Sequence, residues 1–112
     1  MKRPRIFLSA ALIATLSFGS AHADTSETGR VTTLIVEGNN VISINLSGTD
    51  STGECSGGAR WTITPNDPLY KEKYATILAA AQSGQEITLV HLSSNGCGFF
   101  ASNKVYYVQV NY

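Results

Sequence analysis

The segment from Arg30 to Leu46 reads RVTTLIVEGNNVISINL, and it decides the type of fold. Its first part, Arg30 to Glu37, is rich in the β-branched and aliphatic residues that favour strands. A Gly-Asn-Asn turn follows, and these residue types tolerate the positive φ angles of tight turns. From Val41 to Leu46 apolar and polar residues alternate, which is typical of a strand with one buried face. The segment therefore predicts a β-hairpin.

C-terminal to the hairpin, the pattern predicts three more strands and one helix. The strands are expected at Ala59 to Thr64, Glu86 to Leu92 and Lys104 to Tyr112. The helix is expected from about Pro68 to Ser83, where apolar residues recur at helical spacing. Asp67 is suited to cap its N-terminus, with Pro68 at the first helical position, and Gly84 is suited to end it.

The element order is therefore β-β-β-α-β-β, which predicts a mainly β fold. Five strands with one helix between the third and the fourth is the order of an OB-like, five-stranded antiparallel barrel. The alternative is an open antiparallel sheet with the helix packed on one face.

The N-terminus has the three parts of a secretory signal peptide. Three of the first five residues are basic, Ile6 to Phe18 carry no charge, and Ala21-His22-Ala23 is a small-residue cleavage site. The apolar run of about 13 residues is shorter than the about 20 that cross a bilayer. We expect cleavage after Ala23, a periplasmic or secreted location, and no membrane insertion of the mature protein.

After cleavage, the polar residues 24–29 are expected to form a flexible N-terminal arm. Residues 30–112 are expected to form a single OB-like domain with one disulfide. The mature chain has five basic and eight acidic residues, a net charge of about −3. Nucleic acid is not an expected partner, because its binding depends on clustered positive charge.

Cys55 and Cys97 are the two cysteines of the chain. An even number of cysteines in a short exported protein predicts a disulfide. A redox-active pair would normally have the C-x-x-C spacing, which these cysteines lack. A metal site would need more ligands than His91, the one histidine of the mature part. We therefore expect a structural disulfide, no metal and no cofactor.

The stretch from Lys71 to Leu89, KEKYATILAAAQSGQEITL, resembles the helix, turn and strand of a large, mostly uncharacterised group of small exported bacterial proteins with an OB-like fold. It is similar, more weakly, to the same segment in B subunits of pertussis-like and subtilase-like toxins. Those subunits form pentamers and bind cell-surface glycans. The resemblance implies an OB-like scaffold, and a glycan ligand and a homo-oligomer by analogy. At residue level it extends from about Trp61 to Gly98, and no glycan-contacting residue is carried over to this chain.

The candidate binding residues lie in the loop around Cys97 and on the last strand: Asn95, Phe99, Phe100, Asn103 and Tyr107. Two adjacent phenylalanines in a Gly-rich loop cannot easily both point inward, and exposed rings beside Asn and Ser suit sugar stacking or protein docking. The alternative is that one ring fills the end of the barrel under the disulfide. Tyr107 has an equivalent alternative, packing against the helix or a second subunit.

We expect no catalytic residue. His91 is expected to be a packed or half-exposed neutral imidazole, because no nucleophile stands in a recognisable catalytic setting. The leading hypothesis is an exported, non-catalytic module that binds a glycan or a protein. The alternatives are a small periplasmic inhibitor or structural protein, and a secreted hydrolase that uses His91.

Overall fold

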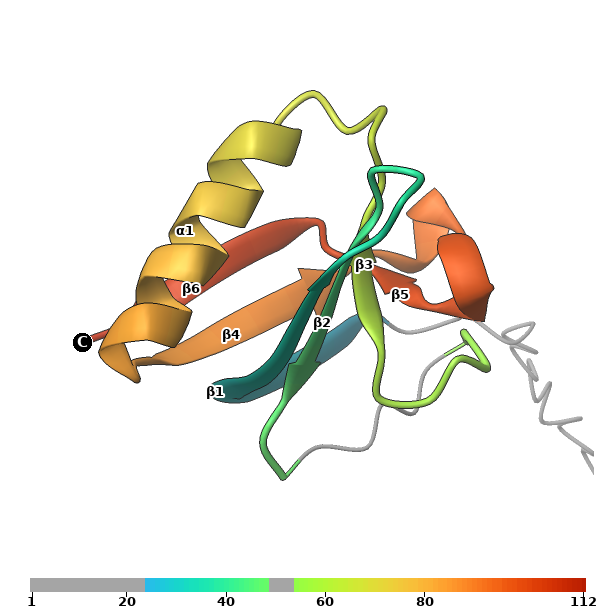
Figure 1. The fold of residues 1–112 in the computed structure, drawn as a ribbon. Helices are drawn as coiled ribbons and strands as arrows, with labels where there is room; N and C mark the ends of the chain where they lie inside the picture. The colour runs from blue at the N-terminus through green and yellow to red at the C-terminus, as the bar shows by residue number, and fades with distance from the viewer. Residues whose placement is uncertain (1–23, 49–53) are drawn as a thin grey trace, which may run out of the picture.

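The computed structural model describes residues 24–48 and 54–112. Within them, one helix lies beside a six-stranded mixed sheet that curls into a half-barrel (Figure 1). The predicted signal peptide lies outside the described residues.

The strands follow the predicted order, with one addition at the C-terminus. They are β1 (Thr25–Val36), β2 (Ile42–Leu46), β3 (Trp61–Ile63), β4 (Glu86–His91), β5 (Asn103–Lys104) and β6 (Tyr107–Asn111), and helix α1 (Tyr70–Ser83) lies between β3 and β4. Across the sheet the order is β5-β3-β2-β1-β4-β6. Neighbouring strands are antiparallel except β3 and β5, which are parallel. The prediction of a mainly β fold with one helix after the third strand is confirmed.

Strand β1 begins much earlier than the sequence predicts. Thr25 to Arg30 pair with β4, and Val31 to Val36 pair with β2, with a register shift between Val31 and Thr33. The prediction of a flexible arm at 24–29 is therefore wrong for residues 25–29. The segment lacks an apolar pattern because its main-chain ladder to β4, rather than side-chain burial, holds most of it in place.

The predicted last strand is divided into β5 and β6. Between them the Val105 N–H donates to the Thr62 carbonyl at 2.9 Å, and the Tyr106 N–H donates to the Val90 carbonyl at 2.7 Å. The chain thus crosses from β3 to β4 at this point, and side-chain alternation is interrupted. Val105 is buried, whereas Tyr106 and the next residue are both exposed. Unbroken alternation would place Tyr106 on the same buried face as Val108. Tyr106 is exposed instead.

The core lies between the concave face of the sheet and α1. Its buried members are Ile42, Ile44, Leu46, Trp61, Ile63, Ile77, Ala80, Ile87, Leu89 and Val105. The alternation predicted for the second strand places its isoleucines and leucine in this core, although Ser43 on the other face is buried too. Figure 1 shows α1 along one side of the sheet, beside β6.

The two ends of α1 compare differently with the prediction. Gly84 ends the helix in the left-handed conformation, with φ of 70°, as expected. The start is two residues later than predicted, with Leu69 at the N-cap position. Asp67 lies two residues before this N-cap position, and its Oδ1 accepts a hydrogen bond from the Leu69 N–H at 2.8 Å. No helix in the described part of the chain is long and apolar enough to cross a membrane.

Candidate functional site

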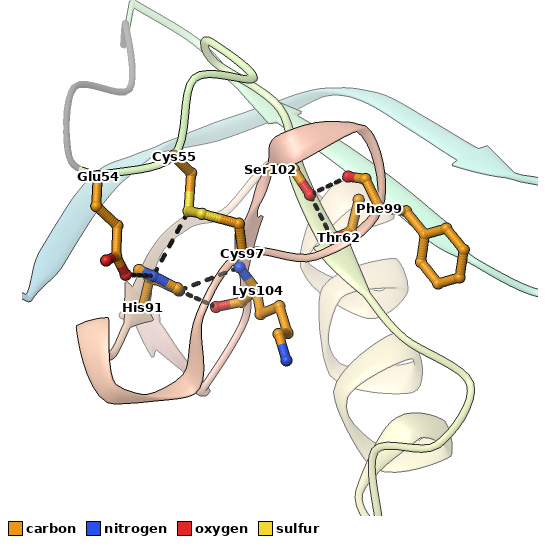
Figure 2. Close-up of a disulfide and its surroundings, with 8 residues drawn as sticks. All are labelled: Glu54, Cys55, Thr62, His91, Cys97, Phe99, Ser102 and Lys104. Carbon is orange, nitrogen blue, oxygen red and sulfur yellow. Dashed lines mark hydrogen bonds and ion pairs between the residues drawn. A yellow bond between two sulfur atoms is a disulfide. The ribbon is translucent and has the colours of Figure 1, made fainter.

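The loops at the β5 end of the sheet are joined by the predicted disulfide. Cys55 and Cys97 are bonded, with 5.7 Å between their Cα atoms. Cys55 is buried, whereas Cys97 is exposed. This bond links the segment before β3 to the loop before β5 (Figure 2).

The loop that follows Cys97 has an unusual main-chain conformation. Phe100 and Ala101 both have positive φ, 62° and 53°. A bulky residue rarely adopts this region, and such conformations persist only where the surroundings impose them. Here the Gly57 N–H donates to the Ala101 carbonyl at 2.7 Å, and the Gly98 N–H donates to the Ser102 carbonyl at 2.8 Å.

Two buried hydroxyls secure the same loop from beneath. The Ser102 hydroxyl donates to the Phe99 carbonyl at 2.6 Å, and its oxygen lies 2.6 Å from the Thr62 hydroxyl (Figure 2). Because Ser102 has a single hydroxyl hydrogen, Thr62 must be the donor in the second bond. Strand β3 therefore holds the loop through one chain of two hydrogen bonds.

This loop presents both phenylalanines to solvent. Phe99 is 44% exposed and Phe100 is 51% exposed, so neither ring is fully buried at the end of the sheet. Their ring centres lie 6.4 Å apart. The Arg60 guanidinium lies 4.4 Å from the centre of the Phe100 ring, a cation–π contact.

A groove runs from Phe99 to the exposed tyrosines Tyr106 and Tyr107. Its larger part, of about 610 Å³, lies between the turn after β3 and the crossing between β5 and β6. An adjoining hollow of about 440 Å³ reaches Cys97 and Phe99. Both parts include Thr64, Asn66 and Lys104 in their lining. We call the two parts together the aromatic groove.

Aromatic rings stand at both ends of the aromatic groove. Tyr106 and Tyr107 are 47% and 45% exposed, and their ring centres are 6.1 Å apart in an edge-to-face arrangement. Between the ends lie hydrogen-bonding side chains, among them Asn66 and Asn95. Such a combination of apolar surface with a few polar groups is typical of small-molecule sites.

The charges in the groove are unevenly neutralised. Lys73 forms an ion pair with Asp67 at 2.6 Å and also donates to the Val105 carbonyl at 2.9 Å. Within the described ranges, no carboxylate forms an ion pair with Lys104. Among the described residues that line the groove, Lys104 is therefore the charged side chain without an opposite charge beside it.

The structure brings three of the five predicted binding residues to this groove: Asn95, Phe99 and Tyr107. Phe100 is exposed but lines neither part. Asn103 is fully buried and pairs with Trp61 in the sheet, so its prediction as a ligand contact is wrong. Asn66, Lys104 and Tyr106 were not predicted. The interruption that exposes Tyr106 between β5 and β6 has no clear sequence signal, and Asn66 comes to the groove from the distant turn after β3.

His91 is fully buried at the end of β4, which agrees with a packed imidazole. Its Nε2 lies 3.0 Å from Glu54 Oε1, and its Nδ1 lies 3.1 Å from the Lys104 nitrogen and 3.2 Å from the Lys104 carbonyl oxygen (Figure 2). If the Lys104 N–H donates to Nδ1, the proton of the neutral ring is on Nε2 and points to the Glu54 carboxylate. Glu54 was not predicted as a partner, because it is distant in sequence and lies in a polar loop.

Comparison of the chain with family models, with curated proteins and with solved structures finds no match.

Proposed function

We propose that this protein is an exported, non-catalytic module that binds a saccharide in the aromatic groove. The observation that carries the proposal is the groove itself, which has exposed rings at both ends and hydrogen-bonding side chains between them.

The chemistry of the groove suits a sugar better than a purely apolar ligand. Tyrosine and phenylalanine rings offer flat apolar faces on which the C–H face of a pyranose can stack, and tyrosine adds a hydroxyl. Thr64 donates to Oδ1 of Asn66 at 2.7 Å, which leaves the Asn66 amide N–H groups for an incoming hydroxyl oxygen. The charge of Lys104 favours acidic sugars over neutral ones.

The fold supports the same proposal through its connectivity. If β5 and β6 are counted as two halves of one strand, that strand pairs with β3 through its first half and with β4 through its second. Strand β1 likewise pairs with β2 and with β4. We propose that this arrangement is an OB-like barrel, the scaffold of the glycan-binding toxin subunits that the Lys71 to Leu89 segment resembles.

The disulfide supports the proposed export, because such bonds persist in oxidising compartments. We propose that export follows the predicted signal peptide, with cleavage after Ala23. Buried His91 supports a non-catalytic role, since both of its ring nitrogens already face protein atoms.

A second candidate function is a small inhibitor that acts through the loop around Phe100. One observation favours it: a loop held by the disulfide and by main-chain hydrogen bonds displays a half-exposed ring outside the groove. A rigid loop loses little entropy on binding a protein, which is how many small inhibitors gain affinity.

The test of saccharide binding is an array of neutral and acidic oligosaccharides, followed by calorimetric titration of each sugar that binds. Tyr107→Ala and Phe99→Ala are each expected to weaken binding at least about tenfold, since burial and stacking of one ring contribute about 1.5 kcal/mol or more.

Tyr112→Ala is the matched control, because Tyr112 is fully exposed and lies outside the aromatic groove. It should leave affinity within about twofold. The proposal fails if no sugar on the array binds, or if Tyr107→Ala and Tyr112→Ala bind equally well. Loss of binding to a protein target in Phe100→Ala alone would favour the inhibitor instead.

A further inference from the structure

We infer that the Cys55–Cys97 disulfide masks a zinc site. In the reduced protein, both cysteine thiolates, His91 and Glu54 would together bind one Zn²⁺. This inference does not depend on the proposed saccharide binding.

The donor atoms already lie close together. Cys55 Sγ is 3.8 Å from His91 Nε2, and Glu54 Oε1 is 3.0 Å from the same nitrogen. One donor atom from each of these three residues lies within 4.8 Å of the others. In a tetrahedral zinc site the donor atoms are about 3.3–3.8 Å apart, so small side-chain movements suffice. Cys97 supplies the fourth donor, because its sulfur is bonded to that of Cys55.

The main chain of Lys104 can bind either tautomer of the His91 ring, the one expected with the disulfide closed and the one that a bound metal requires. With the disulfide closed, the Lys104 N–H can donate to Nδ1, and the ring proton on Nε2 points to Glu54. A metal on Nε2 requires the other tautomer, in which Nδ1 carries the proton. That proton would be accepted by the Lys104 carbonyl oxygen, which is 3.2 Å away. Histidines that bind metals typically donate their second N–H in this way to a carboxylate or a carbonyl.

Reduction need not separate the two cysteines. With the disulfide closed, the Gly57 N–H donates to the Ala101 carbonyl, and Cys97 is paired with Asn103 in a β-bridge. Because these main-chain contacts do not involve the sulfur atoms, they would keep the two loops close together after reduction. The two thiolates would therefore stay near His91, which lowers the entropy lost on binding the metal.

The disulfide can be reached by a reductant from one side. Cys55 is buried, but Cys97 is exposed and lines the smaller part of the aromatic groove. A thiolate of a dithiol reductant would attack Cys97 Sγ, form a mixed disulfide and release the Cys55 thiolate. The second thiol of the reductant then closes its own disulfide and releases the Cys97 thiolate. The reductant loses two electrons, and Zn²⁺ binding displaces any thiol protons to solvent.

The donor set indicates zinc in particular. Two thiolates, one imidazole and one carboxylate match the ligand types that zinc accepts in four-coordinate sites. His91 is fully buried and Cys55 almost so, which suits a closed structural site rather than a catalytic site with an open position.

The test titrates Co²⁺, as a spectroscopic substitute for Zn²⁺, into the protein without oxygen. The disulfide is first reduced with a phosphine, which leaves no competing thiol. Reduced protein should bind one Co²⁺ with a thiolate-to-cobalt charge-transfer band, and one equivalent of Zn²⁺ should remove that band. Oxidised protein should show no band. Glu54→Gln and His91→Asn should each weaken zinc affinity at least tenfold.

Glu72→Gln is the matched control, because Glu72 is an exposed carboxylate on α1, and its zinc affinity should equal that of wild type. If His91→Asn does not fold, nitrogen NMR of the reduced, zinc-loaded wild type replaces it, and Nε2 should be the metal-bound nitrogen. The inference is overturned if the reduced protein gives no charge-transfer band. It is also overturned if Glu54→Gln and Glu72→Gln bind zinc equally, or if zinc fails to raise the melting temperature of the reduced protein.

Discussion

The Gly57 N–H donates to the carbonyl oxygen of Ala101 at 2.7 Å, which brings two loops 44 residues apart into main-chain contact. A Cβ on Gly57 would lie 2.6 Å from the Phe100 oxygen and 2.7 Å from the Ala101 oxygen. Only glycine permits this approach, so the position of the Phe99–Ala101 turn depends on it.

Gly57→Ala is therefore expected to lower the free energy of unfolding by about 1–3 kcal/mol, as is typical of overpacking. It should also weaken saccharide binding, because Phe99 shifts with the turn. Urea unfolding measures the first effect. Gly38→Ala is the control, because a Cβ at Gly38 meets no atom within 4 Å. Equal stability of the two variants would contradict the close approach.

Removal of the disulfide by Cys55→Ser with Cys97→Ser is expected to destabilise the protein by about 4 kcal/mol. The value follows from the chain entropy of a loop closed over a sequence separation of 42 residues. Thermal unfolding of the double variant and of oxidised wild type measures the difference. A melting temperature unchanged by the substitutions would contradict this estimate.

The two buried hydroxyls beneath the Phe99 turn should differ in their contributions. Ser102→Ala removes the partner of both Thr62 and the Phe99 carbonyl, so two polar groups lose a hydrogen bond. Thr62→Val removes only a donor, and the Ser102 hydroxyl keeps its bond to Phe99. We expect a loss of about 1–3 kcal/mol for Ser102→Ala and about 1 kcal/mol for Thr62→Val. Chemical denaturation of both variants measures the two losses of stability. A larger loss for Thr62→Val than for Ser102→Ala would contradict the assigned donors.

Glu27 on β1 is only 9% exposed, and within the described part of the chain neither of its carboxylate oxygens has a hydrogen-bond partner. Burial of a carboxylate without partners is unfavourable. Glu27→Gln, which removes the charge, is therefore expected to stabilise the fold by about 1 kcal/mol. Glu86→Gln, at an exposed carboxylate on β4, should change stability by less than about 0.5 kcal/mol. A clear loss of stability in Glu27→Gln would refute this account.

The strands and the helix could be predicted where side-chain pattern and local chemistry agree. Ile42, Ile44 and Leu46 alternate with polar residues, and Gly84 allows the left-handed conformation that ends α1. The pairing of Cys55 with Cys97 could be predicted from their number and from the expectation of an exported chain. These features depend on residues that are close together in the sequence or on composition. Both can be read directly from a single sequence.

Other features depend on contacts between distant segments, and only the tertiary structure decided them. Residues 25–29 form a strand because β4 offers its main chain, not because of their own side chains. Tyr106 and Tyr107 are both exposed because the chain crosses from β3 to β4 between β5 and β6. Glu54 meets His91 across 37 residues, after the strands and the disulfide have brought their loops together. Strand pairing and loop closure of this kind leave no periodic mark in the sequence, since they are determined by the partner segment rather than by the residues themselves.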